Sequence, residues 1–175
     1  MSAIHFNDLS FHYSKAVPIL DSTSFSLGRG WTGVVGSNGA GKTTTSKMIV
    51  GLLKPTSGTV TVCGMDVEQD YQKVKSIVSY VPDHPYVYDK LSGREFLYFV
   101  GRMYGMTESD ITSASDRYAD VLGASGYLDN MIESCSHGMK QRIVIIAALM
   151  HDPRVIVVDE PLVGLDPKSC RVVKD

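Results

Sequence analysis

The segment Gly36–Thr44 has the residue types and the spacing that bind the phosphates of a nucleotide. Its sequence, GSNGAGKTT, fits the pattern G-x-x-x-x-G-K-[ST] at every fixed position. Gly39 and Gly41 let the backbone curl until successive N–H groups face one centre, and a helix that starts there adds its positive dipole end. Lys42 brings a charge to the β and γ phosphates, and the Thr43 hydroxyl suits Mg²⁺. We therefore expect this loop to bind phosphate through Gly36, Ser37, Asn38, Gly39, Ala40, Gly41, Lys42, Thr43 and Thr44.

The segments on either side of this loop predict the elements that position it. Residues 31–35, WTGVV, are rich in β-branched residues and predict a short buried strand. Residues 43–50 predict a helix that Gly51 closes. Because strand, loop and helix agree, a chance glycine-rich turn is a poor explanation of the motif.

Two neighbouring carboxylates form a second candidate site. Residues 154–158 are mostly β-branched and predict a central parallel strand, buried on both faces, that ends at Asp159 and Glu160. Asp159 would hold Mg²⁺ directly or through water, and Glu160 could act as a general base on an attacking water. By itself such a pair also fits a solvated strand end, but the phosphate loop favours the catalytic interpretation.

A third segment identifies the family. Residues 134–142, SCSHGMKQR, resemble the signature motif of ATP-binding cassette (ABC) ATPases in the variant form Ser-x-Gly-Met-x-Gln-Arg. Residues 164–167, GLDP, resemble the D-loop of that family, and the order of the motifs matches it. The resemblance extends along the chain: residues 9–13 resemble the opening strand, residues 58–64 the strand after the first helix, and residues 80–83 the Q-loop.

The family implies a fold and a division of the chain. We expect an α/β P-loop NTPase fold, with an ABC-type core sheet flanked by helices and an inserted helical subdomain. The single domain would consist of a core, residues 1–82 and 151–175, and a helical subdomain at about 83–150. Within that subdomain, a capping box at Ser92 and Glu95, a helix start at Thr107 and a helix from Gly138 to Met150 predict three helices.

The resemblance also implies roles for individual residues. Tyr13 would stack on the adenine, while Ser136 and Gly138 would contact the γ-phosphate held by a second copy of the cassette. Asp83 stands where the family has the Q-loop glutamine. A carboxylate there can hold Mg²⁺ or its waters, but it cannot donate a hydrogen bond unless it is protonated. We therefore take Asp83 as a candidate for both metal binding and catalysis.

Other departures from the family concern the signature and the end of the chain. His137 and Met139 replace the second and fourth residues of the usual Ser-Gly-Gly-Gln. None of the five histidines follows Gly164, so the switch histidine of the family is missing, and the sequence stops at Asp175 inside an expected helix. From this we expect a C-terminally truncated chain with impaired hydrolysis.

Several aromatic side chains follow the Q-loop position. We expect Tyr86 and Tyr88 to belong to a docking surface, because the family meets its membrane subunits there, and Phe96 and Phe99 to be core residues. His137 is expected to be a solvated residue at a helix start, and Cys135 and Met139 to be packing residues.

Composition limits the classes of function. The net charge of −2 gives no reason to expect nucleic acid. The longest apolar run, 143–150, is too short to span a bilayer, and the N-terminus lacks a signal-peptide pattern. The three cysteines are widely spaced, which favours reduced thiols in a cytosolic protein.

We therefore expect the ATP-binding and hydrolysing subunit of a membrane ABC transporter, similar to ABC-2 exporters, with ATP and Mg²⁺ as ligands. Its partners would be a second cassette in a head-to-tail homodimer and a transmembrane permease. The permease would hold it at the inner face of the cell membrane. The alternatives are a soluble ABC ATPase of translation or DNA repair, and a binding-only fragment. A GTPase is disfavoured because the sequence contains no Asn-Lys-x-Asp string.

Overall fold

The computed structural model describes residues 3–14 and 17–159. The chain divides into two compact units, Met1–Val78 and Ser79–Asp175. The phosphate loop belongs to the first unit, whereas the signature segment and Asp159 belong to the second. The division expected from the sequence, with a helical subdomain at about 83–150, remains a prediction.

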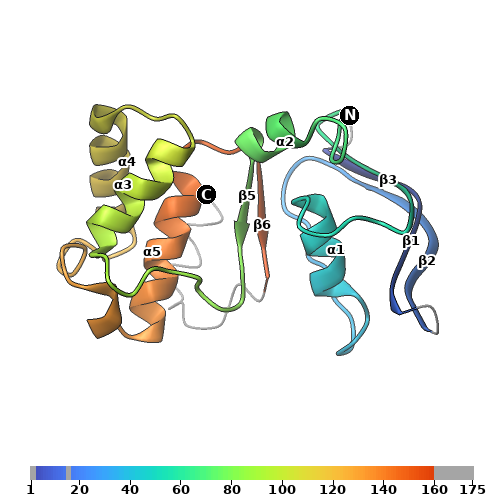
Figure 1. The fold of residues 1–175 in the computed structure, drawn as a ribbon, viewed down its shortest axis with the longest axis horizontal. Helices are drawn as coiled ribbons and strands as arrows, with labels where there is room; N and C mark the ends of the chain where they lie inside the picture. Colours follow the sequence, from blue (N-terminus) through green and yellow to red (C-terminus); the bar gives the residue numbers. More distant parts are fainter. Residues whose placement is uncertain (1–2, 15–16, 160–175) are drawn as a thin grey trace. The chain divides into compact units, whose positions relative to one another are not determined.

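The first unit is built on an antiparallel sheet of four strands (Figure 1). The strands are β1 (Ile4–Ser14), β2 (Val17–Leu27), β3 (Ser57–Val62) and β4 (Met65–Asp66), and their order in the sheet is β2-β1-β3-β4. Strand β1 is central: Ile4 lies opposite Leu27 of β2 and opposite Val62 of β3. The expected strands at 9–13 and 58–64 are therefore confirmed.

A bulge in β1 keeps its apolar residues on one face. Ile4 and Phe6 are buried two residues apart, but the next buried positions are Leu9 and Phe11. This alternation slips by one residue between Phe6 and Leu9, and the register shifts at the same place, where Asp8 has a φ of 49°. Since a slip of one residue exchanges the two faces of a strand, the bulge restores the apolar side chains to the core.

Two helices accompany this sheet. Helix α1 (Lys42–Ile49) packs on β3, and α2 (Tyr71–Ile77) packs on β4. Helix α1 buries Thr44, Met48 and Ile49. Gly51 follows the helix with a φ of 70°, and its N–H donates to the carbonyl of Met48. The predicted helix after the phosphate loop and its glycine stop are confirmed.

The strand predicted at residues 31–35 is wrong. The structure assigns no strand there, and Trp31, Val34 and Val35 are exposed, Val35 to 95%. β-branched residues favour a strand only where a neighbour completes the hydrogen-bond ladder. No strand pairs with this segment among the residues that the structure describes. The lack of a pairing strand in the described part of the chain therefore outweighs the strand preference of residues 31–35.

The second unit combines a pair of strands with a group of helices (Figure 1). Strand β5 (Val78–Val81) pairs with β6 (Val155–Val158), and the two arrows in Figure 1 point the same way. The predicted strand before Asp159 is confirmed, but only Val157 is fully buried and Ile156 is exposed. The expected burial on both faces is therefore wrong, because no second strand flanks β6 among the described residues.

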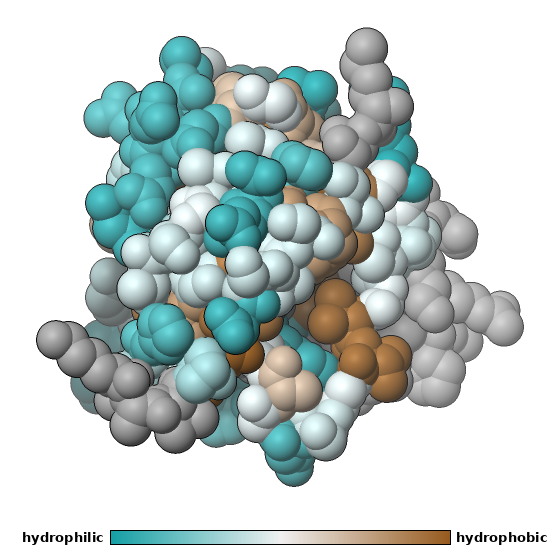
Figure 2. All heavy atoms as spheres, turned by 90° about the vertical axis from the view of Figure 1, so that its right-hand side faces the viewer, coloured by the Kyte–Doolittle hydropathy of each residue, from teal (hydrophilic) through white to brown (hydrophobic). Residues whose placement is uncertain are grey.

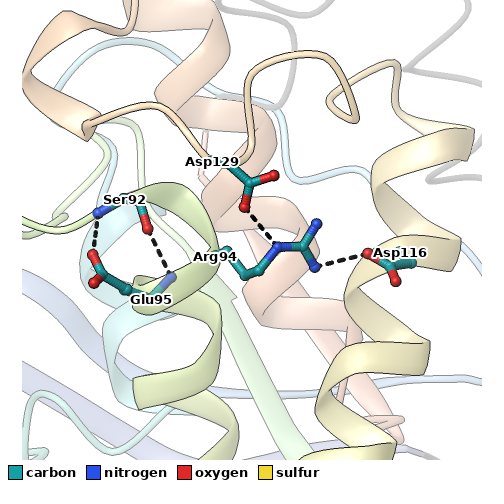
Figure 3. A network of polar contacts seen from close by, with 5 residues as sticks. All are labelled: Ser92, Arg94, Glu95, Asp116 and Asp129. Atoms are coloured by element: carbon teal, nitrogen blue, oxygen red, sulfur yellow. Dashed lines mark hydrogen bonds and ion pairs between the residues drawn. The ribbon is translucent and has the colours of Figure 1, made fainter.

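Each α-helix that the structure describes in the second unit begins with a side-chain cap. Helices α3 (Gly93–Met103), α4 (Glu108–Val121) and α5 (His137–Leu149) have Ser92, Thr107 and Ser136 as their N-caps, and a short 3₁₀ helix spans Ile132–Ser134. At α3, Figure 3 shows the complete capping box between Ser92 and Glu95. The three predicted helices are confirmed, and α5 starts one residue earlier than expected.

Ion pairs tie α3 to its neighbours. The Arg94 guanidinium donates to Asp129 at 2.7 Å and to Asp116 of α4 at 2.8 Å (Figure 3). Both carboxylates hold the pKa of Arg94 above its usual value, with the hydrogen bond to Asp129 as the largest cause. The network links two helices and the loop before α5.

The core of the second unit lies between α3, α4 and α5. Helix α5 is its centre and buries most of its length, with Ile143 and Ile146 completely enclosed. Phe96 is buried as predicted, but Phe99 is 42% exposed, so its assignment to the core is wrong. Phe99 is three residues beyond Phe96 and lies about 60° further round α3, on the side away from the buried Leu97, so it falls at the edge of the face that meets the core.

Figure 2 looks at the side of the molecule on which β1 and β2 lie. Hydrophilic side chains and side chains of intermediate hydropathy cover much of this surface, and apolar side chains appear in separate patches. Among the residues that the structure describes, no helix is long and apolar enough to span a membrane.

Candidate nucleotide-binding site

The phosphate loop has the backbone conformation that its glycines predict. Gly39 and Gly41 have φ values of 84° and 85°, which L-residues with a Cβ rarely adopt. Helix α1 begins directly afterwards, at Lys42. The Lys42 ammonium donates to the carbonyls of Gly36 and Ser37 at 2.8 and 2.9 Å. The lysine side chain therefore folds back over the loop, and its charge stands beside the helix N-terminus.

The loop is accessible to a ligand. Residues 36–40 and Thr43 are exposed, whereas Gly41 and Thr44 are buried. The Thr45 hydroxyl and N–H both donate to the Gly41 carbonyl, which fixes the first turn of α1. A helix start with accessible N–H groups and a nearby ammonium favours an anion with several negative oxygens.

Tyr13 lies beside the phosphate loop. Its hydroxyl is 3.4 Å from the Thr44 Oγ1, and the residue is 66% exposed. Phe11, on the same strand, is buried and meets the Tyr13 ring edge-on, with 4.8 Å between ring centroids. Of these two rings, Phe11 therefore belongs to the core and Tyr13 is accessible to a ligand. The role of Tyr13 in stacking on adenine remains a prediction.

In the second unit, Asp159 is held at the end of β6. It is buried, its N–H donates to the Val81 carbonyl at 2.9 Å, and its Oδ2 accepts from the Tyr80 hydroxyl at 3.3 Å. Burial, followed by the charge of Asp159, raises the pKa of Tyr80 to about 12. Tyr80 therefore stays protonated at neutral pH and orients the carboxylate. The sequence motifs do not predict this partner, although its place on the strand paired with β6 is a usable signal.

Two expected features lie outside the described residues. These are Glu160, the candidate general base, and the D-loop at residues 164–167. Their roles remain predictions from the sequence.

The signature segment places Ser136 at the start of a helix. Its Oγ accepts the Met139 N–H at 3.3 Å, and both Ser136 and His137 are exposed. A serine hydroxyl that accepts from the backbone can still donate to a second group, such as a phosphate oxygen. Gly138, in the first turn, is half-buried. Cys135 is buried and Met139 packs against the core, as predicted.

Asp83 and the signature segment are joined by two histidines. His84 Nδ1 lies 3.5 Å from Asp83 Oδ2, and the rings of His84 and His137 meet edge-on at 6.2 Å between centroids. The sequence motifs do not predict this proximity, because 53 positions separate the two histidines. In the part of the chain that the structure describes, no group of three or more metal-binding side chains occurs.

The comparisons with known proteins identify the family. The sequence matches the family described as "ABC transporter" over residues 20–163. It is 41% identical over 152 residues to the linearmycin resistance ATP-binding protein LnrL of Bacillus subtilis, covering 86% of this chain and 49% of LnrL. It is 33% identical over 163 residues to the ABC transporter ATP-binding protein NatA of the same organism, covering 92% of this chain and 66% of NatA. The chain belongs to the ABC transporter ATP-binding family.

A solved structure supports the fold. The structure of an ATP-binding subunit of an ABC transporter superposes with a TM-score of 0.84 at 27% identity, covering 98% of this chain and 72% of that one. The expected P-loop NTPase fold with the ABC architecture is therefore confirmed. The chain spans about half the length of LnrL and of the uncharacterized protein YhcH, which it matches at 49% and 51% of their lengths.

Proposed function

We propose that this chain binds and hydrolyses ATP as the nucleotide-binding subunit of a membrane ABC transporter. The observation that carries the proposal is the conformation of the phosphate loop: two glycines with positive φ lead into α1, and Lys42 is folded over them. The family membership adds ATP as the nucleotide. The name of LnrL, a resistance protein, favours an exporter, because resistance through transport requires removal of the drug.

Mg²⁺ would accompany the nucleotide. The exposed Thr43 hydroxyl, in the first turn of α1, suits a hard cation, and so does the Asp159 carboxylate that Tyr80 orients. Asp83 remains a third candidate ligand. The cation would supply charge neutralisation on the phosphate oxygens. Glu160 would then accept a proton from the attacking water.

Two partners follow from the proposal. The first is a second cassette in head-to-tail orientation. The Ser136 hydroxyl and the helix N-terminus at Gly138 would contact the nucleotide that this second copy holds. Closure of the two copies around ATP, and opening after hydrolysis, would drive the transporter. Nothing in the net charge of −2 favours nucleic acid as a partner.

The second partner is a transmembrane permease, which would keep the chain at the inner face of the cell membrane. Tyr86 and Tyr88 are 81% and 58% exposed and follow the Q-loop position. Tyr86 also lines a cavity of about 260 Å³, whose other walls are mostly aromatic and aliphatic side chains that include Tyr80, Phe96, Val100 and Tyr104. Exposed aromatics around an apolar cavity suit the insertion of an apolar side chain from a docked segment.

The test compares Lys42→Ala with Lys47→Ala, a change of the same kind in the last turn of the same helix. ATP with Mg²⁺ at about a hundred times its dissociation constant should stabilise the wild-type chain by about 2.7 kcal/mol. Lys42→Ala should abolish that stabilisation and the hydrolysis of ATP, whereas Lys47→Ala should retain both. An ATP-induced shift of melting temperature that survives in Lys42→Ala would contradict the proposal.

A further inference from the structure

The loop that carries Tyr86 and Tyr88 is held at both ends by the first turns of α5. At its start, the buried Gln141 side chain donates from Nε2 to the Pro82 carbonyl at 3.4 Å. At its end, the Lys140 ammonium lies 2.7 Å from the Asp89 carboxylate. Two adjacent residues of one helix therefore contact both ends of the segment from Pro82 to Asp89.

The backbone strengthens the second of these attachments. The N–H of Glu133 donates to the Asp89 carbonyl at 3.1 Å, and the N–H of Ile132 donates to the Leu91 carbonyl at 2.9 Å. Further along, Ser92 and Met131 form an antiparallel bridge. The segment that leads into α5 thus lies beside the end of the loop, and the two are expected to move together.

Lys140 is directly connected to the signature serine. Its backbone N–H donates to the Ser136 carbonyl at 2.9 Å, which is the hydrogen bond of the first turn of α5. Residues four apart lie on the same face of a helix, so the Lys140 side chain shares a face with Ser136. A displacement of the Lys140 side chain would therefore shift the first turn of α5, which orients Ser136.

A neighbouring ion pair provides a contrast. Lys90 and Glu133 also link the loop to the segment before α5, at 2.6 Å, but their side chains are 83% and 47% exposed. The Lys140 side chain is only 22% exposed, although Asp89 is 58% exposed. Exposed pairs contribute little because water and salt screen them. The Lys140–Asp89 pair is the less screened of the two, and its lysine is a residue of α5.

We propose that the Lys140–Asp89 ion pair positions Ser136 by coupling the start of α5 to the Tyr86 and Tyr88 loop. A partner that binds the loop would then set the geometry in which Ser136 meets the nucleotide of a second copy. Lys140 is a positioning residue in this proposal, because Asp89 neutralises its charge and it contacts no reacting atom. The inference rests on the proposed function of Ser136 and adds the ion pair that sets the position of this serine.

The experiment uses charge reversal and its repair. Lys140→Glu and Asp89→Lys each place like charges together, and the double variant restores an opposite pair with the charges exchanged. The matched control set is Lys90→Glu, Glu133→Lys and their double variant. For each protein we would measure the melting temperature, the ATP affinity of the monomer, ATP-driven dimerisation, and kcat and KM for hydrolysis.

We expect the two single reversals at Lys140 and Asp89 to lower dimerisation and kcat by about tenfold, and the double variant to recover most of that loss. Monomer ATP affinity and KM should stay within about twofold, because the phosphate loop is unchanged. The Lys90 and Glu133 set should stay close to wild type in every measurement. An unchanged melting temperature and normal ATP binding by the monomer separate positioning from a general loss of folded protein, which would also lower the apparent kcat at an unchanged KM.

A second measurement does not depend on ATP. Amide hydrogen exchange should become faster both in residues 84–91 and in residues 136–140 of Lys140→Ala, and in neither segment of Lys90→Ala. Exchange that rises in only one of the two segments would overturn the coupling.

Two results of the charge-reversal experiment would overturn the proposed coupling. A double variant as impaired as Lys140→Glu would show that the lysine charge acts by itself, which would overturn the proposal. Single reversals that dimerise and hydrolyse like wild type would overturn it as well. A wild-type chain that fails to bind ATP would instead contradict the proposed function, and hydrogen exchange would still test the coupling.

Discussion

The Tyr13 hydroxyl lies 3.4 Å from the Thr44 Oγ1, so an exposed ring from β1 stands beside the first turn of α1. The two residues are 31 positions apart in the sequence. Their proximity depends on the hairpin of β1 and β2 and on the Gly41 backbone, against which the Ile19 side chain of β2 lies. The sheet thereby brings an aromatic surface to the edge of the phosphate loop.

Replacing Tyr13 by alanine should weaken ATP binding. Stacking of a base on an aromatic ring contributes about 1–2 kcal/mol, so the dissociation constant should rise about 5- to 30-fold in Tyr13→Ala. Titration calorimetry with a non-hydrolysable ATP analogue would measure the change. Tyr13→Phe is the control, because it keeps the ring and removes only the contact with Thr44. Equal losses in both variants would mean that the hydroxyl, not the ring, is what matters.

Ser136→Asp should block ATP-driven dimerisation without unfolding α5. Ser136 caps the helix by accepting the Met139 N–H, and aspartate is an equally good N-cap. The new carboxylate, however, would face the γ-phosphate of the second copy, and like charges repel. Size-exclusion chromatography with and without ATP would measure dimerisation.

The matched control for Ser136→Asp is Ser134→Asp. Ser134 is exposed, donates to the Met131 carbonyl and lies two residues before the cap. Ser134→Asp should dimerise like wild type. If Ser136→Asp lost ATP binding in the monomer as well, the serine would belong to the site of its own chain.

The sequence predicts most reliably what local chemistry decides. The starts of α3, α4 and α5 follow from Ser92, Thr107 and Ser136, because a capping side chain and the amide that it accepts lie within a few residues. The phosphate loop is equally local, since its conformation depends on glycines within the motif.

The failures depend on distant partners. Residues 31–35 have the composition of a strand, but a strand exists only where another one pairs with it. Phe99 lies in a well-predicted helix, but which face that helix buries depends on how α4 and α5 pack against it. The contact of Tyr80 with Asp159 and the Lys140–Asp89 pair were missed for the same reason, as 79 and 51 positions separate the partners.

Glu160→Gln should retain ATP binding and slow hydrolysis. If Glu160 is the general base, its loss should reduce kcat by roughly 10²–10⁴-fold, because glutamine cannot accept the proton of the attacking water. The closed state could no longer reset, so ATP-bound dimers should accumulate. Glu108→Gln, on the exposed first turn of α4, is a control that removes a carboxylate elsewhere. Near-normal turnover in Glu160→Gln would show that another group activates the water.

The last prediction concerns His151, which stacks on Tyr104 with 3.7 Å between ring centroids and 10° between the ring planes. Burial lowers the pKa of His151 below its usual value of 6.5, and this outweighs the opposing effects of the Ala147 backbone and of Asp152. The folded state therefore favours the neutral imidazole. A depressed pKa contributes stability that is present above the unfolded value and is lost as the pH falls through the folded value.

The free energy of unfolding should accordingly decrease as the pH falls below about 6.5, the unperturbed pKa of histidine. His151→Phe keeps a ring against Tyr104 and removes the titrating group, so its stability should depend less on pH in this range. Tyr104→Ala leaves His151 in place and admits water to it, so the pKa of His151 should rise towards its usual value. Urea denaturation at several pH values would measure the first effect, and an NMR titration of the His151 ring protons the second. A wild-type His151 that titrates at or above 6.5 would contradict this prediction, because burial by Tyr104 would then have no consequence for its charge.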